Sequence, residues 1–201
     1  MEFEKIKKNL EEKGYQVSCF DTKEEAAEYL DREIDGCTVG AGGSVTLEQL
    51  GIYEKLCTHN DFKWQQRVPE GKTHVDMRFA GLTTEVYLTS ANAVAETGEI
   101  VNIDGTCNRV AAMHYGHRKV YFIVGENKIT KDLESAIRRA RNVASPLNAK
   151  RLKRNTPCAE KADRCYDCKS PERICKALSV FWLCPGNGEY EVLLIKEDLG
   201  Y

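Results

Sequence analysis

Four cysteines lie within eighteen residues of this chain, in the stretch CAEKADRCYDCKSPERIC. They are Cys158, Cys165, Cys168 and Cys175, with the spacing C-x6-C-x2-C-x6-C. Two thiolates separated by two residues can reach one metal centre from a single tight turn, and the outer pair then completes a four-thiolate shell. The stretch therefore predicts a metal centre. Zinc and an iron–sulfur cluster both accept four cysteines, so the ligands alone leave that choice open.

A second candidate is the glycine-rich stretch VGAGGSVT, which places Gly40, Gly42 and Gly43 at the end of a predicted strand. A helix is predicted to begin just afterwards, near Ser44 or Thr46. The backbone N–H groups of such a turn, with the positive end of the helix dipole, suit a phosphate or a carboxylate. The spacing is neither that of the P-loop nor the Rossmann G-x-G-x-x-G, so nucleotide binding is not indicated. The alternative is a tight turn without a ligand.

The stretch SANAVAETGEIVNIDGTCNR is richer in polar side chains than a core segment should be. Arg109 can bind an anion through two hydrogen bonds, and Asp104 can orient that anion or hold a hydroxyl. Asn92 and Asn108 are placed to contact the rest of a small ligand, and Glu96 can act as a base or a nucleophile if it is partly buried. The alternative is that the Asn and Asp residues form turns, which is the usual role of Asp-Gly.

Residues 138–154 carry seven Lys or Arg side chains and no acidic one. This basic run can face an anionic ligand or partner. Cations near the C-terminal end of a helix are also favoured by the helix dipole, so a solvated helix face is the alternative.

The predicted elements alternate between helix and strand, and their order sets where these residues lie. Helices are expected over 3–13, 21–34 and 130–144, and strand-like runs lie within 15–20, 85–103, 119–129, 177–183 and 190–197. This alternation is typical of an α/β domain with a mostly parallel sheet flanked by helices. Ligands of such sheets bind outside the carboxyl ends of the strands, where the three stretches around the glycine turn, Asn92 and Arg109 are expected to meet.

The pattern changes after Ser145-Pro146, where a basic stretch, the cysteines and two terminal strands follow. We therefore predict an α/β ligand-binding domain over residues 1–150. Residues 151–201 are predicted to form a small cysteine-rich metal module with closing strands, packed on the same domain.

Composition narrows the class of protein. The chain has 201 residues, 42% hydrophobic and 30% charged, with a net charge of −2, so neither a disordered chain nor a nucleic-acid surface is indicated. No segment has the character of a signal peptide or the length of a membrane span, and a cytoplasmic protein is expected. In a reducing compartment, clustered cysteines are more often metal ligands than disulfide partners.

The residues resemble a known family, the LUD domain, named for lactate utilisation. The resemblance runs through GAGGSVTLEQLG, VYLTSANAVAETGEIVNIDGTCNRVAA, VYFIVGENKI, NVASPLNAKRL and CYDCKSPERIC, and so covers nearly the whole chain. It implies a fold like that of ribose-phosphate isomerases and coenzyme A transferases, with the glycine turn facing a small anionic metabolite. Some members take part in lactate oxidation with iron–sulfur subunits, so the resemblance favours a [4Fe-4S] cluster over zinc and other lactate-utilisation subunits as partners.

The interpretation of two residues, Cys107 and Glu96, depends on that resemblance. The family pattern D-G-T-G-N-R has a second glycine where this chain has Cys107, and a cysteine with positive φ there costs on the order of 1 kcal/mol. Either the position does not need positive φ or the thiol is wanted. The related transferases attack with a glutamate in a Glu-x-Gly context, which Glu96 matches in AETGE.

The leading hypothesis is a LUD-domain protein that binds a lactate-like or phosphorylated anion and carries a four-cysteine metal centre for oxidoreductive organic-acid utilisation. A second is a coenzyme A transferase or sugar-phosphate isomerase with a structural zinc. A third is a ligand-binding or assembly subunit without catalysis. The sequence does not decide the oligomeric state.

Overall fold

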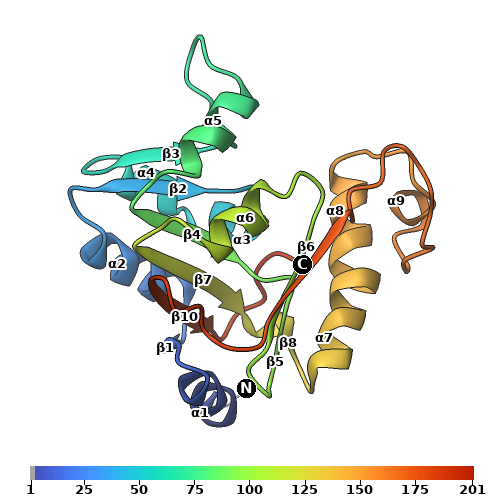
Figure 1. Cartoon of the computed structure of the whole chain (residues 1–201), viewed down its shortest axis with the longest axis horizontal. Helices are drawn as coiled ribbons and strands as arrows, with labels where there is room; N and C mark the ends of the chain where they lie inside the picture. Colours follow the sequence, from blue (N-terminus) through green and yellow to red (C-terminus); the bar gives the residue numbers. More distant parts are fainter. Residues whose placement is uncertain (1–2) are drawn as a thin grey trace.

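A six-stranded sheet forms the centre of the protein, and every pair of neighbouring strands in it is parallel (Figure 1). The computed structural model describes residues 3–201. The strand order is β1-β10-β7-β4-β2-β3. The strands are β1 (Gln16–Phe20), β2 (Thr38–Ala41), β3 (Asp61–Trp64), β4 (Val86–Ser90), β7 (Lys119–Gly125) and β10 (Glu189–Ile195). The predicted α/β class with a mostly parallel sheet is therefore confirmed.

Helices cover both faces of this sheet, which explains why its central strands are almost continuously apolar. Along β7, Tyr121 and Ile123 point to one face and Val120 and Phe122 to the other. The first face is covered by α2 (Lys23–Glu33), α3 (Val45–Leu50) and α4 (Ile52–Leu56), and the second by α1 (Glu4–Glu12) and α6 (Asn108–His114). No helix formed by residues 3–201 combines the length and apolarity that crossing a bilayer requires.

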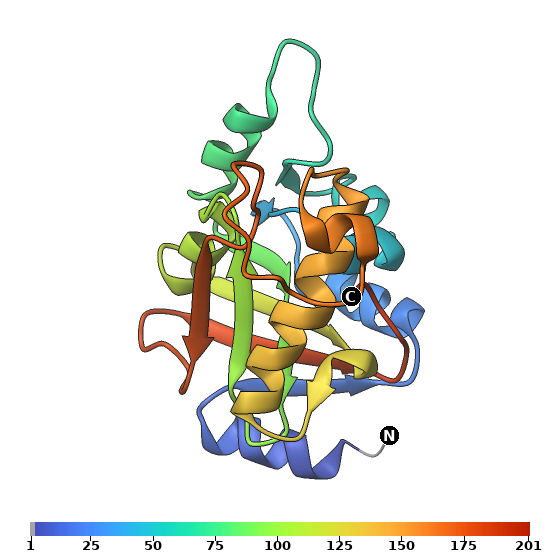
Figure 2. The same cartoon turned by 90° about the vertical axis from the view of Figure 1, so that its right-hand side faces the viewer.

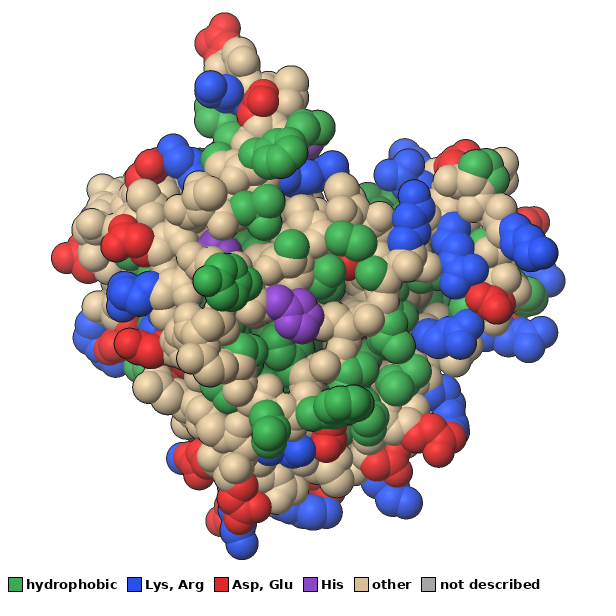
Figure 3. All heavy atoms as spheres, viewed as in Figure 1, with side chains coloured by type: hydrophobic (Ala, Val, Ile, Leu, Met, Phe, Trp, Pro, Cys, Tyr) green, Lys and Arg blue, Asp and Glu red, His purple; other side chains and the backbone are tan. Residues whose placement is uncertain are grey.

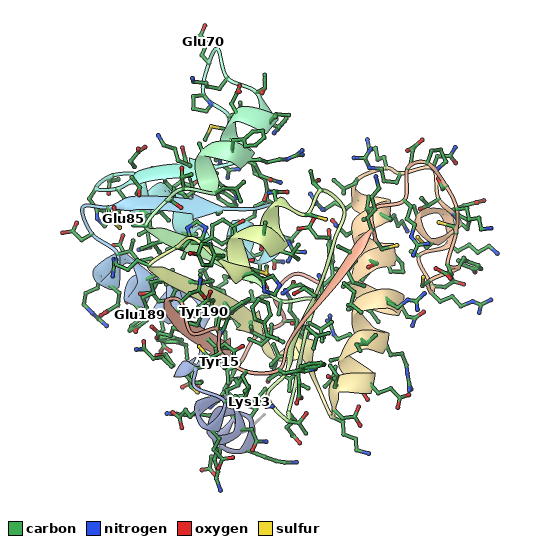
Figure 4. The ribbon with its side chains drawn as sticks, in the orientation of Figure 1. Lys13, Tyr15, Glu70, Glu85, Glu189 and Tyr190 are labelled. Carbon is green, nitrogen blue, oxygen red and sulfur yellow. The ribbon has the colours of Figure 1, made fainter. Side chains whose placement is uncertain are left out.

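The β3 edge of the sheet carries α5 (His74–Gly81), and a long loop precedes that helix. The loop projects from the body of the protein, with Glu70 at its tip (Figure 4). Thr73 begins α5 with a capping box, in which its hydroxyl accepts from Asp76 N and the Asp76 carboxylate accepts from Thr73 N. This cap fixes the start of the helix that carries Arg78 toward the candidate site.

A second sheet of four strands, in the order β8-β5-β6-β9, lies against the first. Its strands are β5 (Ala93–Ala95), β6 (Ile100–Asp104), β8 (Ile129–Thr130) and β9 (Ala177–Phe181). The sequence pattern indicated β-rich runs here but not that they leave the main sheet. Val94, Ile100 and Phe181 join the main core, whereas Val101 packs with Ala136 on the opposite face.

One long helical segment crosses the outer face of this small sheet (Figure 2). It consists of α7 (Leu133–Arg139), a π-helical turn η2 (Ala140–Ala144) and α8 (Ser145–Arg151). The helix was expected to end before Pro146, because a proline inside a helix has no N–H to donate and crowds the preceding turn. The wider π-helical turn directly before Pro146 accommodates it, and the helix continues. This continuation carries Asn148 and Arg151 to the candidate site.

The predicted boundary near residue 150 falls at the end of this helix. After it come α9 (Pro157–Lys161), the cysteine stretch and the two last strands. β9 pairs with β6 in the small sheet, and β10 lies inside the main sheet between β1 and β7. Tyr190 of β10 and Tyr15, just before β1, belong to the same buried cluster (Figure 4). The closing strands thus complete both sheets.

Candidate functional site

The loops at the carboxyl ends of the parallel strands surround a cavity of about 370 Å³, a volume suited to a small molecule. The turn after β2, the segment after β4, the start of α6 and the 3-10 turn η1 (Glu126–Lys128) supply one side. The other side comes from α8 and from residues 171–176 of the cysteine stretch. Open α/β sheets place their ligands at this edge, as the order of elements predicted.

Seven of the predicted ligand-binding residues line the cavity together: Gly43, Ser44, Thr46, Asn92, Asp104, Asn108 and Arg109. Gly40 and Gly42 do not line it. A Cβ at Gly40 would lie 2.6 Å from Gly81 O, and one at Gly42 would lie 2.8 Å from the Tyr87 hydroxyl. Both glycines therefore permit the close packing of α5 and β4 against β2.

Ser44 has a structural role that the turn motif did not reveal. Its hydroxyl accepts from Leu47 N at 3.3 Å and caps α3. Its own N–H donates to Gln66 Oε1 at 2.6 Å. The Ser44 N–H is thus bound to Gln66, and this hydrogen bond has to break before the N–H can donate to an anion.

Asp104 and Asn92 organise the backbone around the cavity as well as lining it. The Asp104 carboxylate accepts from Thr106 N at 3.1 Å and from Val110 N at 3.2 Å, so it shapes the turn that leads into α6. Asn92 Oδ1 accepts from Ile103 N at 2.7 Å. The alternative role of Asp and Asn as turn-forming residues therefore applies here, without removing either side chain from the cavity wall.

Arg109 lies where the sequence placed it, but most of its donors already have partners. Its NH1 donates to Asn102 Oδ1 and its NH2 to Ile103 O, both at 2.6 Å. Its Nε is 3.9 Å from Asp104 Oδ2, and its side chain is only 14% exposed. Arg109 therefore ties α6 to β6, and its remaining capacity and its positive charge are available to the cavity.

Lys128 is the cavity residue whose importance the sequence did not indicate. It is 3% exposed, and its Nζ donates to Thr46 Oγ1 at 2.7 Å and to Ser90 Oγ at 2.8 Å. Burial lowers its pKa to about 7, and the positive charges of Arg139 and Arg109 add to that effect. The only signal in the sequence was a lysine directly after the apolar run of β7, in VGENKI.

Positive charge dominates the cavity wall. Seven Lys or Arg residues line it against two carboxylates, Asp104 and Glu172. These seven residues are Arg78, Arg109, Lys128, Arg151, Arg154, Arg173 and Lys176. Lys and Arg side chains also gather over α8 and the segment that follows it, at the right of Figure 3. The sequence raised an anion-facing role for the run 138–154, and Arg151 and Arg154 of that run line the cavity.

Glu96 does not line the cavity. It lies in the turn between β5 and β6, where its carboxylate forms an ion pair with Lys5 of α1. Asn9 Nδ2 donates to its carbonyl oxygen at 2.6 Å. The strand β5 separates Glu96 from Asn92, so the two residues of the stretch SANAVAE lie at opposite ends of that strand. The structure therefore does not bring the predicted base or nucleophile to the predicted ligand-binding residues.

The cysteine stretch adjoins the cavity but does not form a metal shell. Cys158, Cys168 and Cys175 line one small cavity of about 10 Å³, whereas Cys165 Sγ instead accepts from Asp167 N at 3.3 Å. Nowhere in residues 3–201 are three or more His, Cys, Asp or Glu side chains arranged to hold a metal ion. Burial raises the pKa of Cys175. Three of the four predicted ligands thus share one cavity, and Cys165 does not line it.

The cavity at the strand ends and the small cysteine cavity share part of their walls. Ser145, Arg173 and Ile174 line both. Arg173 donates from NH1 to Cys168 O at 2.8 Å and from Nε to Cys175 O at 2.9 Å. The conformation of the cysteine stretch therefore sets the position of one cation in the cavity at the strand ends.

Cys107 adopts φ +67° at the N-cap of α6, so this position does need the left-handed conformation. Replacing Cys107 with glycine is expected to raise the free energy of unfolding by about 0.5–1 kcal/mol, because glycine adopts positive φ without a steric cost. Urea denaturation of the variant tests this. Cys107→Ala keeps the Cβ and should leave stability unchanged, and an equal gain from alanine would contradict the explanation.

Comparison with known proteins agrees with the fold. The family model described as the LUD domain matches residues 3–195. A solved structure, described as a DUF162 family protein from Deinococcus radiodurans, aligns with a TM-score of 0.53 at 10% identity, over 95% of this chain and 94% of that one. At this identity the likeness concerns the fold alone. No curated protein matches the sequence significantly. Since the family model covers almost the whole chain, the chain belongs to the LUD domain family.

Proposed function

We propose that this LUD-domain protein binds a small anionic metabolite in the cavity at the carboxyl ends of its parallel strands. The observation that carries the proposal is the charge of the wall, with seven Lys or Arg residues against two carboxylates. Such a surplus of cations favours carboxylate and phosphate groups, which accept charge-assisted hydrogen bonds. A lactate-like organic acid and a phosphorylated compound are the two classes that fit.

Arg78 supports the same proposal. It lines the cavity, and its Nε is buried without a hydrogen-bond partner among residues 3–201. A buried donor without an acceptor costs free energy, and an anionic ligand supplies the missing acceptor. Glu96 does not line the cavity, so a coenzyme A transferase reaction through Glu96 is not part of this proposal.

Neutralising two cations of the wall is expected to weaken binding. A thermal-shift screen of organic acids, sugar phosphates and acyl-coenzyme A compounds finds the class, and calorimetry then measures affinity. Arg151→Gln combined with Arg154→Gln should weaken it about 5- to 30-fold, because each partly exposed charge contributes up to about 1 kcal/mol. Lys150→Gln is the matched control, since Lys150 is exposed on the same helix and does not line the cavity. Unchanged affinity in the double variant would place the ligand elsewhere.

We also propose that the four cysteines hold a metal centre, a [4Fe-4S] cluster rather than zinc. The C-x2-C pair and the small cavity shared by Cys158, Cys168 and Cys175 support it. The bond from Asp167 N to Cys165 Sγ lies within the C-x2-C turn and is compatible with metal binding, since a ligating thiolate can also accept N–H hydrogen bonds. Such a centre supplies electron transfer beside the anion cavity, which agrees with a role in organic-acid utilisation together with other iron–sulfur subunits.

Protein purified without oxygen is expected to contain iron and sulfide. Cys165→Ser should lose this metal and become more sensitive to protease after about residue 150, because a four-ligand site couples metal binding to local folding. Cys184→Ser is the control, since Cys184 does not line the small cavity, and it should keep the metal. Stoichiometric zinc without sulfide would show that the site holds a structural zinc and not a cluster. Protein free of any metal would show that the cysteines form no metal site.

A further inference from the structure

Lys128 is buried in the wall of the anion cavity without a carboxylate partner. Its side chain reaches the cavity from η1, directly after β7, and both of its hydroxyl partners, Thr46 and Ser90, also line the cavity. Across the described part of the chain, no Asp or Glu lies within 4.0 Å of its Nζ. Buried lysines in proteins are usually paired, so this one requires another explanation.

The hydrogen bonds around Lys128 leave its nitrogen lone pair unused. The Thr46 hydroxyl donates to Leu199 O at 3.3 Å and the Ser90 hydroxyl donates to Ala91 O at 3.4 Å. Since both hydroxyl hydrogens point to carbonyl oxygens, both hydroxyls accept from Lys128 Nζ. A neutral amine has two N–H bonds, which these two hydroxyls satisfy. Its lone pair then has no protein partner, and Ser90 is not set to pass its proton to Lys128 as a serine–lysine pair requires.

The charges that face Lys128 favour this neutral form. Desolvation is the main cause of its lowered pKa of about 7, and the guanidinium groups of Arg139 on α7 and Arg109 on α6 contribute. The backbone of Gly200 lies beside this amine, since an added Cβ there would lie 3.2 Å from Nζ. A neutral amine in a cationic cavity is the usual state of a lysine that attacks carbonyl groups.

We propose that Lys128 is a nucleophile and forms an imine with the carbonyl carbon of a small anionic aldehyde or ketone. The proposal rests on the proposed function, because the cations of the cavity hold the carboxylate or phosphate of the same molecule. A 2-oxo acid and an open-chain sugar phosphate share this chemistry. Lys128 thereby gives the anion cavity a reactive centre, which Glu96 does not provide.

The step balances without an oxidant or a reductant. The lone pair of Nζ attacks the carbonyl carbon, a C–N bond forms, and the π electrons of the carbonyl move to its oxygen. That oxygen takes a proton from the nitrogen, which gives a carbinolamine. A second proton transfer from nitrogen to oxygen releases water, and the nitrogen electrons form the C=N bond. One carbonyl compound and one amine therefore give one imine and one water.

Reductive trapping tests the proposal. The full-length protein is incubated with pyruvate or with glyceraldehyde 3-phosphate and sodium cyanoborohydride, and the modified lysine is located by peptide mass spectrometry. We expect a secondary-amine adduct at Lys128 that forms about 10- to 100-fold faster than at Lys176 at pH 7, because an ordinary lysine is almost fully protonated there. The two compounds distinguish a carboxylate from a phosphate ligand. Lys176, exposed in the same cavity, is the internal control.

Two variants and a binding assay distinguish failure of the imine proposal from failure of the proposed anion binding. Lys128→Arg removes the amine and should abolish the adduct, whereas Lys150→Met, at an exposed lysine outside the cavity, should leave it unchanged. Lactate and glycerol 3-phosphate carry no carbonyl that forms an imine, and their affinities measure the anion site alone. Binding of these anions with no adduct at Lys128 overturns the imine and leaves the proposed function intact. Adducts spread over surface lysines, or absence of all anion binding, also overturn it, and the latter removes the proposed function as well.

Discussion

Replacing Arg109 with alanine is expected to lower the free energy of unfolding by about 2–4 kcal/mol and to weaken anion binding by about 1.5–3 kcal/mol. The stability loss follows from the two 2.6 Å hydrogen bonds to Asn102 Oδ1 and Ile103 O. Asn102 is fully buried, and its Nδ2 already has no partner among residues 3–201. Removal of the guanidinium takes a charge-assisted hydrogen bond from each acceptor, which costs about 1–3 kcal/mol each, and leaves Asn102 Oδ1 with only its bond from Asn92 N at 3.2 Å. Urea denaturation and calorimetry with the best anion measure both effects.

Two further variants show which property of Arg109 matters. Arg109→Lys keeps the charge but cannot reach both acceptors from a planar fork, so stability should fall by less than in alanine while affinity is partly retained. Arg138→Ala is the control, because Arg138 is exposed on α7 and pairs with Glu134 across one helical turn. That pair contributes only about 0.3–0.5 kcal/mol. An Arg109→Ala protein as stable as the parent would show that the guanidinium does not tie α6 to β6.

Replacing Lys128 with methionine is expected to stabilise the protein, and the gain should depend on pH. The pKa of Lys128 is about 7 in the folded state, below the value near 10.4 of an unfolded lysine. Between these values the unfolded chain binds the additional proton, so the stability of the parent rises as the pH increases from about 7 to about 10. Below pH 7 the buried charge imposes its full cost, on the order of 4 kcal/mol.

The variant should therefore exceed the parent by about 2–4 kcal/mol at pH 6, with the difference disappearing toward pH 10, since methionine also loses the bonds to Thr46 and Ser90. Denaturant unfolding at several pH values measures this. Lys150→Met changes an exposed lysine and should give a difference that does not vary with pH in this way. A Lys128→Met protein that is less stable than the parent at every pH would show that Lys128 is a structural cation rather than a reactive amine.

A lysine retained at this cost is typical of a functional site, where stability is exchanged for reactivity. The same cavity contains Arg78, with a buried Nε that lacks a partner. Both side chains cost folding free energy, and the proposed anion would offset the cost at Arg78 by accepting from its Nε.

The sequence by itself determined the class of fold and one half of the cavity. Apolar runs alternating with amphipathic helices predict a parallel sheet, and Ser44 caps α3 where the sequence placed a helix start. The side chains of the turns after β2, β4 and β6 meet because parallel strands present their carboxyl ends at one edge. Seven residues that line the cavity could be named from the sequence for that reason, since each lies at or shortly after the end of a predicted strand.

The tertiary structure alone decided the features that depend on contacts between distant segments. Lys128 differs from an exposed lysine only because Thr46, Ser90 and Arg109 come from three other elements and exclude water from it. Glu96 matched a short motif, but the departure of β5 from the main sheet carries it to Lys5 instead of the cavity. Burial and charge are properties of the neighbours in space, and a side chain's own sequence context does not contain them.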